Sequence, residues 1–206
     1  FNRQEEVVLL HFTIEGGRYM LYPLNALQQA GGQFDPPRGS ARGVAFLGRT
    51  RFACLEGGGA LKLRNMENQA TKQLELPHGY SSAEGLFQAA TQGRVIVRTE
   101  DKLCLFETQS HRVINEITGF RSRYIVWSPD MAMAAISSRT GITVVDRELN
   151  QLCTINEPVR VKSMCWEERG VLLYNTPSHL KYLIVPPEGT GDRGSSGDAK
   201  AAKQQA

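Results

Sequence analysis

The sequence predicts an all-β fold, a β-propeller built from four-stranded blades, and three observations support this prediction. Similar segments recur about every 40 residues along the chain. Each segment consists of short runs rich in Val, Ile, Leu and Phe, and Gly, Pro, Asp or Ser interrupts the runs where turns are expected. A period of this length made of short strand signals is typical of propellers. Helical repeats of similar length fit poorly, because they need longer runs with a 3.6-residue period.

The repeat is visible when four segments are aligned. They are "GVAFLGRTRFACLEGGGALKLRN" from residue 43, "EGLFQAATQGRVIVRTEDKLCLFE" from 84, "RYIVWSPDMAMAAISSRTGITVVD" from 123 and "KSMCWEERGVLLYNTPSHLKYLIV" from 162. An aromatic residue closes the first run of each, at Phe46, Phe87, Trp127 and Trp166. The third runs begin at Leu61, Leu103, Ile142 and Leu180. We expect the aromatic residues to be structural and to fill the space between adjacent blades, rather than to serve as exposed anchors.

The strand signals assign the chain to blades in order. "EVVLLHFT" and "RYMLYPL" predict two strands of a first blade, and residues 25–42 are predicted to form a long surface loop. Complete blades follow at about 43–76, 84–117 and 123–155, closed by the short runs "KQLEL", "RVINEI" and "QLCTI". The runs "KSMC", "GVLLY" and "HLKYLIV" predict a further blade without its outer strand. Such an incomplete ring implies either missing partner blades or an open strand edge at residues 1–13.

Two turns carry recognisable chemistry. In Ser128-Pro129-Asp130 the proline ring presets a turn and Asp130 can bond its own backbone, so the chain can reverse into the second strand. "EGGG" at 56–59 lacks the Lys-Ser/Thr pair of a phosphate-binding loop and falls where a hairpin turn is required. We therefore expect both segments to be structural turns.

The character of the chain changes at Pro186. Residues 1–185 are predicted to form the partial propeller, whereas residues 186–206 are rich in Gly, Ser, Ala and Lys and are predicted to be a disordered linker or insertion. "GTGDRG" at 189–194 matches G-x-G-x-x-G, but prolines separate it from the preceding strand and no amphipathic helix follows, so no dinucleotide site is expected. Because the chain opens at Phe1 almost directly in a strand signal, we expect a fragment of a longer protein.

Composition excludes several classes of function. The 24 basic and 21 acidic residues are spread along the 206 residues, so no nucleic-acid interface is expected. No apolar run approaches the roughly 20 residues of a membrane-spanning helix. The cysteines show no C-x-x-C pair and no nearby histidines, which predicts buried reduced thiols of an intracellular protein rather than disulfides or a metal site. They are Cys54, Cys104, Cys153 and Cys165.

No constellation of residues predicts catalysis, a metal site or a cofactor site. His11, His78, His111 and His179 fall on separate predicted strands or loops, outside any H-x-H or H-E-x-x-H pattern, and no G-x-S-x-G elbow is present. A non-enzymatic protein is therefore expected. A propeller hydrolase with a site in the central channel is the less favoured alternative.

Two basic groups, "FRSRY" at 120–124 and "PVRVK" at 158–162, precede the first strands of successive blades. They predict an interaction rim of Arg121, Arg123, Arg160 and Lys162. Such a rim could meet acidic protein surfaces or anionic lipid headgroups. A solvated face without a partner is the favoured interpretation of these four residues, and the interaction rim is the alternative.

Several short motifs resemble the second WD-repeat propeller, with its associated region, of the coatomer alpha-subunit family. They are "YIVWSPDM" at 124–131, R-x-L-x-x-L-C-x-I at 147–155, "VRVKSMCW" at 159–166 and "HLKY" at 179–182. Upstream, "NRQEEVVLLHFTIEGGRYMLY" and "RFACLEGGGALKLRNMENQATKQLELP" extend the resemblance over most of residues 1–185. The Gly-His and Trp-Asp signatures of strong WD repeats are absent, so the repeats are of a degenerate WD type.

The resemblance implies a structural scaffold of the COPI vesicle coat, which acts in Golgi-to-ER retrograde and intra-Golgi transport. It implies a cytoplasmic protein, peripheral on Golgi and COPI vesicle membranes. The implied partners are other coatomer subunits, including beta-prime and epsilon, with recruitment of the whole coat by an Arf GTPase. Dilysine cargo recognition is assigned to the family's first propeller, so no cargo-binding residues carry over. The beta-prime subunit, and a peptide-binding propeller of another intracellular complex, remain alternatives.

Overall fold

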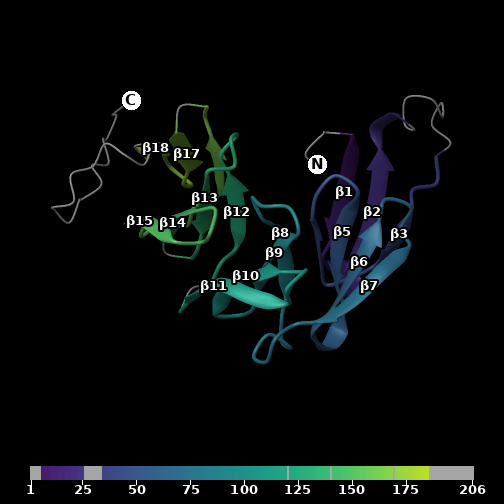
Figure 1. Cartoon of the computed structure of the whole chain (residues 1–206). Helices are drawn as coiled ribbons and strands as arrows, with labels where there is room; N and C mark the ends of the chain where they lie inside the picture. The colour runs from purple at the N-terminus through teal and green to yellow at the C-terminus, as the bar shows by residue number, and fades with distance from the viewer. Residues whose placement is uncertain (1–5, 26–33, 120, 140, 169, 186–206) are drawn as a thin grey trace. The chain divides into compact units, whose positions relative to one another are not determined.

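The computed structural model describes residues 6–25, 34–119, 121–139, 141–168 and 170–185. The predicted linker at 186–206, with its G-x-G-x-x-G match, lies outside the described residues. The chain divides into two compact units, unit 1 from Phe1 to Gly119 and unit 2 from Phe120 to Ala206. Figure 1 labels most of the strands, and strands account for nearly all the regular structure in the described parts of both units. The prediction of an all-β fold is confirmed.

Unit 1 contains three antiparallel sheets, called A, B and C. Sheet A has the order β1-β2-β3, sheet B β4-β5-β6-β7 and sheet C β11-β10-β9-β8. The strands are β1 Val7–Phe12, β2 Arg18–Pro23, β3 Arg38–Ser40, β4 Gly43–Phe46, β5 Arg51–Leu55, β6 Ala60–Asn65, β7 Ala70–Glu75, β8 Gly85–Gln88, β9 Arg94–Arg98, β10 Lys102–Glu107 and β11 Arg112–Thr118. Within each sheet, strands that follow one another in the sequence pair with one another, so each sheet is a simple meander.

Unit 2 contains sheets D and E, built in the same way. Sheet D has the order β12-β13-β14-β15 and sheet E the order β16-β17-β18. The strands are β12 Tyr124–Trp127, β13 Met133–Ser137, β14 Gly141–Asp146, β15 Gln151–Asn156, β16 Ser163–Trp166, β17 Val171–Asn175 and β18 Leu180–Ile184. The predicted blades at 43–76, 84–117 and 123–155 correspond to sheets B, C and D. Sheet E has three strands within the described residues, and the predicted lack of an outer strand stays a prediction, because residues 186–206 lie outside them.

The hydrogen-bonded register confirms the predicted period. The residues predicted to begin the third runs, Leu61, Leu103, Ile142 and Leu180, pair with the last residues of the second strands, Leu55, Arg98, Ser137 and Asn175. Just before each first strand, a backbone amide donates to the carbonyl of that same last residue at 2.8 Å. These amides belong to Arg42, Glu84, Arg123 and Lys162. The four sheets therefore repeat one backbone pattern.

The predicted loop at 25–42 is wrong in one respect, because Arg38–Ser40 forms β3 and pairs with β2. After β3, the Ala41 amide donates to the Gly17 carbonyl, just as the Leu76 amide after β7 donates to that of Gly59. Sheet A therefore supplies the second to fourth strands of the repeat, rather than the two strands expected. No strand pairs with the free edge of β1 in the part of the chain that the structure describes.

The core of unit 1 lies between its sheets. Because strand side chains alternate between faces, Phe46 and Phe52 pack toward sheet A, whereas Ala53 and Leu55 pack toward sheet C. Phe52 and Leu55 are completely buried. Burial on both faces explains the nearly continuous apolar runs of the middle strands.

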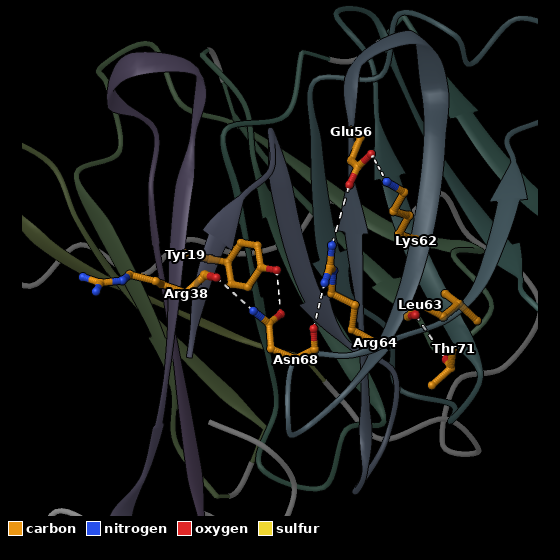
Figure 2. Close-up of polar contacts among 8 residues, drawn as sticks. All are labelled: Tyr19, Arg38, Glu56, Lys62, Leu63, Arg64, Asn68 and Thr71. Atoms are coloured by element: carbon orange, nitrogen blue, oxygen red, sulfur yellow. Dashed lines mark hydrogen bonds and ion pairs between the residues drawn. The ribbon is translucent and has the colours of Figure 1, made fainter. Parts of the chain in front are cut away.

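Polar contacts join sheet A to sheet B, and Figure 2 shows them. Asn68, in the turn after β6, lies between Tyr19 of β2 and the backbone of Arg38 in β3. The Tyr19 hydroxyl donates to Asn68 Oδ1 over 2.7 Å, and Asn68 Nδ2 donates to the Arg38 carbonyl over 2.9 Å. Burial, as the main cause, raises the pKa of the Tyr19 hydroxyl well above its ordinary value. This hydroxyl therefore acts as a neutral hydrogen-bond donor.

The core of unit 2 lies between sheets D and E. Ala135 and Val144 of sheet D pack with Met164, Leu172 and Leu183 of sheet E, all of them buried. The outer strand β18 is different, because its alternate residues are exposed. Leu180 is 76% exposed and Ile184 62%, whereas Leu183 is 6% exposed.

Both predicted structural turns are confirmed. Asp130 Oδ1 accepts hydrogen bonds from the Ser128 hydroxyl at 2.6 Å and from the Ala132 amide at 3.0 Å, and so closes the turn between β12 and β13. Gly58 and Gly59, between β5 and β6, have φ of 75° and 81°. Residues other than glycine rarely adopt such positive φ angles. The "EGGG" segment is a tight hairpin connection.

All four cysteines are free, but they are not all buried as predicted. Cys54 and Cys104 are buried, Cys153 is partly buried and Cys165 is exposed. Cys165 is the third residue of β16, so its side chain points to the opposite face from Met164, which packs in the core. Burial raises the pKa of Cys54 to about 11 and that of Cys104 to about 12.

Candidate interaction surface

The predicted rim residues lie at one edge of unit 2. Arg121 and Arg123 precede β12, whereas Arg160 and Lys162 precede β16, and all four are exposed. The side chain of Trp166 near the end of β16 donates from Nε1 to the carbonyl of Val126 near the end of β12 over 2.9 Å. The two first strands therefore run in the same direction, and their starting points share an edge. The role of these four residues as an interaction rim stays a prediction.

The turn between β13 and β14 belongs to the same edge and adds a cation that the sequence analysis missed. The Arg123 amide donates to the Ser137 carbonyl at the end of β13, and exposed Arg139 follows in the turn. We call the set Arg121, Arg123, Arg139, Arg160 and Lys162 the linker edge. The pairing of β12 with β13 sets Tyr124 opposite Ser137 and so puts this turn beside the linker before β12.

The acidic residue of the linker between β15 and β16 is buried and paired. Glu157 is 3% exposed, and its Oε2 accepts from Lys181 Nζ at 2.8 Å and from the Tyr174 hydroxyl at 3.3 Å. Burial, and then the charge of Glu157, raise the pKa of Tyr174. Glu157 thus ties sheet D to sheet E and leaves the surface of the linker edge to the cations. Within the described residues, no ion pair involves Arg139, Arg160 or Lys162.

The opposite edge of unit 2 is acidic. It is formed by the turns between first and second strands and between third and fourth strands, and its acids are Asp130, Asp146, Glu148, Glu167 and Glu168. Arg147 also lies there, with its guanidinium donating to the backbone carbonyls of Met131 and Asp130. Unit 2 therefore carries basic residues at one end of its strands and mainly acidic residues at the other.

The aromatic residues predicted between blades do not all occupy equivalent positions. Phe46, Trp127 and Trp166 are the fourth residues of β4, β12 and β16, whereas Phe87 is the third residue of β8 and pairs with Ile96. The predicted equivalence of Phe87 is wrong by one residue, and its side chain points to the other face of its sheet. Gln88 occupies the fourth position.

Burial of these aromatic residues also differs. Phe46 is buried, whereas Phe87, Trp127 and Trp166 are partly buried. Phe46 packs in the core between sheets A and B, and Trp166 packs against the core between sheets D and E. At these two positions the fourth residue of the first strand contacts the preceding sheet.

The described residues of unit 1 line hollows that include the following two. One of about 590 Å³ is lined by Glu6, the turn 47–51 and the pair Gln92 and Gly93. Another of about 290 Å³ is lined by Thr13, Gly16, Gly17, Arg42, Glu84 and Arg98. In the described part of the chain, histidine, cysteine and acidic side chains do not gather in any group of three or more that could ligate a metal. Among the same residues, no helix has the length and apolar character needed to cross a bilayer.

A comparison with protein-family models matches residues 1–190 to the model described as COPA/B second beta-propeller. Similar curated proteins include coatomer subunit alpha of Dictyostelium discoideum, 31% identical over 195 residues, and coatomer subunit alpha-1 of Arabidopsis thaliana, 34% identical over 187 residues. These alignments cover 95% and 89% of this chain, and 15% of each relative. The chain thus spans a small part of the length of the curated relatives it matches.

Solved structures show the same fold at low sequence identity. A chain of the mitotic checkpoint complex superposes with a TM-score of 0.64 and 12% identity, over 90% of this chain and 60% of that one. The Cps50 (Swd1) beta-propeller domain of Myceliophteria thermophila superposes with a TM-score of 0.60 and 12% identity, over 93% of this chain and 67% of that one. The repeated antiparallel sheets are therefore those of a β-propeller. By its match over residues 1–190, the chain belongs to the COPA/B second beta-propeller family.

Proposed function

We propose that this chain is a structural scaffold segment of the COPI vesicle coat, within a coatomer alpha subunit. The observation that carries the proposal is the family match across residues 1–190, which spans every strand of both units. The curated relatives compared above are coatomer alpha subunits. Through the coat, the chain serves Golgi-to-ER retrograde and intra-Golgi transport in the cytoplasm, at the surface of Golgi and vesicle membranes.

The role we propose is structural and involves no catalysis. Neighbouring sheets within a unit are held together by buried apolar side chains, so the connecting turns have rigid supports. Polar ties such as Tyr19 with Asn68 and Glu157 with Lys181 add defined geometry between sheets. Loops carried on such a frame can present a fixed contact surface to other proteins.

The partners we propose are other coatomer subunits, including beta-prime and epsilon. Association with the membrane is then peripheral, through a coat whose recruitment depends on an Arf GTPase. The family description covers both COPA and COPB, so a place in the beta-prime subunit is the second candidate.

The proposal is tested by affinity capture of the tagged 206-residue chain from eukaryotic cytosol, followed by mass spectrometry of the bound proteins. We expect coatomer subunits among them. The matched control is Leu172→Lys, which places a charge in the core between sheets D and E, where Leu172 is completely buried, and so should remove captured subunits that need a folded unit 2. Recovery of the folded wild-type chain without any coat subunit would contradict the proposal.

A further inference from the structure

The linker edge collects exposed cations from three separate segments of unit 2. Arg121 and Arg123 lie before β12, Arg139 follows β13, and Arg160 and Lys162 lie before β16. The carboxylate of Glu157, which belongs to the same linker as Arg160, is buried and bound to Lys181. Its charge is therefore compensated below the surface, and the positive potential of the edge is retained.

We propose that the linker edge binds the anionic phospholipid headgroups of a membrane surface. The proposal deepens the proposed function, since it gives the coat segment a direct contact with the membrane. Clusters of Lys and Arg near an anionic bilayer each gain a favourable interaction that salt screens. The acidic edge at the other end of the same strands would be repelled by that bilayer, so the charge distribution also selects one orientation of unit 2.

The arrangement favours a lipid plane over an acidic peptide. The cations stand on separate turns and linkers and are exposed, as a contact with many mobile headgroups requires. Val159, between Pro158 and Arg160, is 43% exposed and gives the basic segment an apolar side chain that can enter the headgroup region. A peptide would instead be held by pairs of charges in fixed geometry.

The test is co-sedimentation of the 206-residue chain with two kinds of vesicle, phosphatidylcholine alone and phosphatidylcholine with about 30 mol% phosphatidylserine, an anionic lipid. We expect binding only to the anionic vesicles, and a steep loss of binding as sodium chloride is raised. The variants Arg121→Glu with Arg123→Glu, and Arg160→Glu with Lys162→Glu, should each lower the partition coefficient by at least about tenfold, since each cation contributes about fivefold.

The matched control is Arg49→Glu with Arg51→Glu, which makes the same change of charge at exposed arginines of unit 1 and should leave most of the binding intact. Arg121→Lys with Arg123→Lys should also bind, because the contact requires charge rather than guanidinium geometry. Circular dichroism of each variant is the check that it remains folded.

Three results would overturn the inference: no binding of the wild-type chain to anionic vesicles, an equal loss in the unit 1 control, or binding to polyglutamate without binding to vesicles. The last would assign the edge to an acidic polypeptide. Capture of coat subunits from cytosol is measured separately, without lipid, so a failed vesicle assay with intact capture would remove the membrane contact and leave the proposed function standing.

Discussion

Among single residues, Asn68 makes hydrogen bonds that bridge sheets A and B. Its φ of 64° lies in the left-handed region, which asparagine tolerates better than most residues. Its side chain joins Tyr19 and Arg38, while its carbonyl accepts from Arg64 Nη1 over 2.8 Å (Figure 2). Arg64 also approaches Glu56 at 4.0 Å, so the turn is linked to the other end of sheet B. Asn68 therefore combines a backbone requirement with a polar bridge.

Replacing Asn68 separates these two roles. Asn68→Ala should lower the free energy of unfolding by about 3 kcal/mol, because two hydrogen bonds at about 1 kcal/mol each are lost and alanine is strained at positive φ. Asn68→Gly should cost about 1 kcal/mol less, because glycine accepts that backbone conformation. Urea unfolding measures both values. Tyr19→Phe, which removes only the hydroxyl, is the control for the hydrogen bond from Tyr19. Equal losses of unfolding free energy in Asn68→Ala and Asn68→Gly would contradict the argument from backbone strain.

At this scale, sequence reasoning predicted positions better than partners. Leu61, Leu103 and Ile142 could be placed because each begins a run and recurs with the blade period. Phe87 could not, since a one-residue difference in strand register is invisible in a spacing near 40 and turns the side chain to the other face. Tyr19 and Asn68 are 49 residues apart, and neither belongs to a motif, so no local pattern could have joined them.

Among the elements, the turn between β12 and β13 depends on the charge of Asp130. Hydrogen bonds from the Ser128 hydroxyl and then from the Ala132 amide hold the pKa of the Asp130 carboxyl below its ordinary value of 3.8. A group whose pKa is lowered in the folded state adds stability above its unfolded pKa and loses that stability as the pH falls. The contribution of this turn should therefore be present at neutral pH and disappear in acid.

Asp130→Ala should accordingly lower the free energy of unfolding by about 1 kcal/mol at pH 7. The difference from the wild-type chain should shrink as the pH falls below about 4, because the protonated carboxyl binds the turn less well. Thermal unfolding at a series of pH values measures this. In Asp130→Asn an amide oxygen remains as acceptor, so its difference from the wild type below pH 4 should also be small. A constant gap between Ala and wild type across the series would disprove the charge dependence.

Strand β18 has two faces with opposite consequences for mutation. Leu180 and Ile184 are exposed, whereas Leu183 is buried in the core between sheets D and E. An edge strand with exposed apolar residues is prone to pair with other chains. The double variant Leu180→Lys and Ile184→Lys should therefore reduce self-association in light scattering and keep the stability of the chain. Leu183→Lys, the control at the buried face, should lose several kcal/mol of stability. Unchanged association in the double variant would refute this.

Strand β3 shows why short elements escape sequence analysis. Arg38, Gly39 and Ser40 have low strand propensity and follow two prolines, so the segment resembles a loop. In the structure its position is set by partners, because its residues pair with Arg18, Tyr19 and Met20 of β2. The Tyr19 side chain also lies so close to Gly39 that an added Cβ would clash with its hydroxyl oxygen and with its ring. A glycine here allows strand and aromatic ring to pack together.

At the scale of the whole chain, stability is distributed over contacts between neighbouring sheets. One apolar cluster joins sheets A and B, another joins B and C, and a third joins D and E. The repeat could be recognised from the sequence because every sheet buries apolar strand residues in the same pattern and with the same period. Repeat proteins of this kind approximate a sum of nearest-neighbour terms. A substitution that weakens the packing of one cluster should therefore lower the local stability mainly of the two sheets that share it.

Phe52→Ala tests this distribution directly. Phe52 is completely buried between sheets A and B, and its ring lies edge-on to Tyr19 with centroids 5.6 Å apart. The substitution should cost about 3–5 kcal/mol at that cluster. Hydrogen exchange followed by mass spectrometry should then show faster exchange in β1, β2, β4 and β5, with protection in β16 and β17 close to wild type. Leu172→Ala, a buried residue of the cluster between sheets D and E, should give the reverse pattern. Equal acceleration in both units for both variants would mean that the chain unfolds as one cooperative block, and that its sheets do not contribute as separable neighbours.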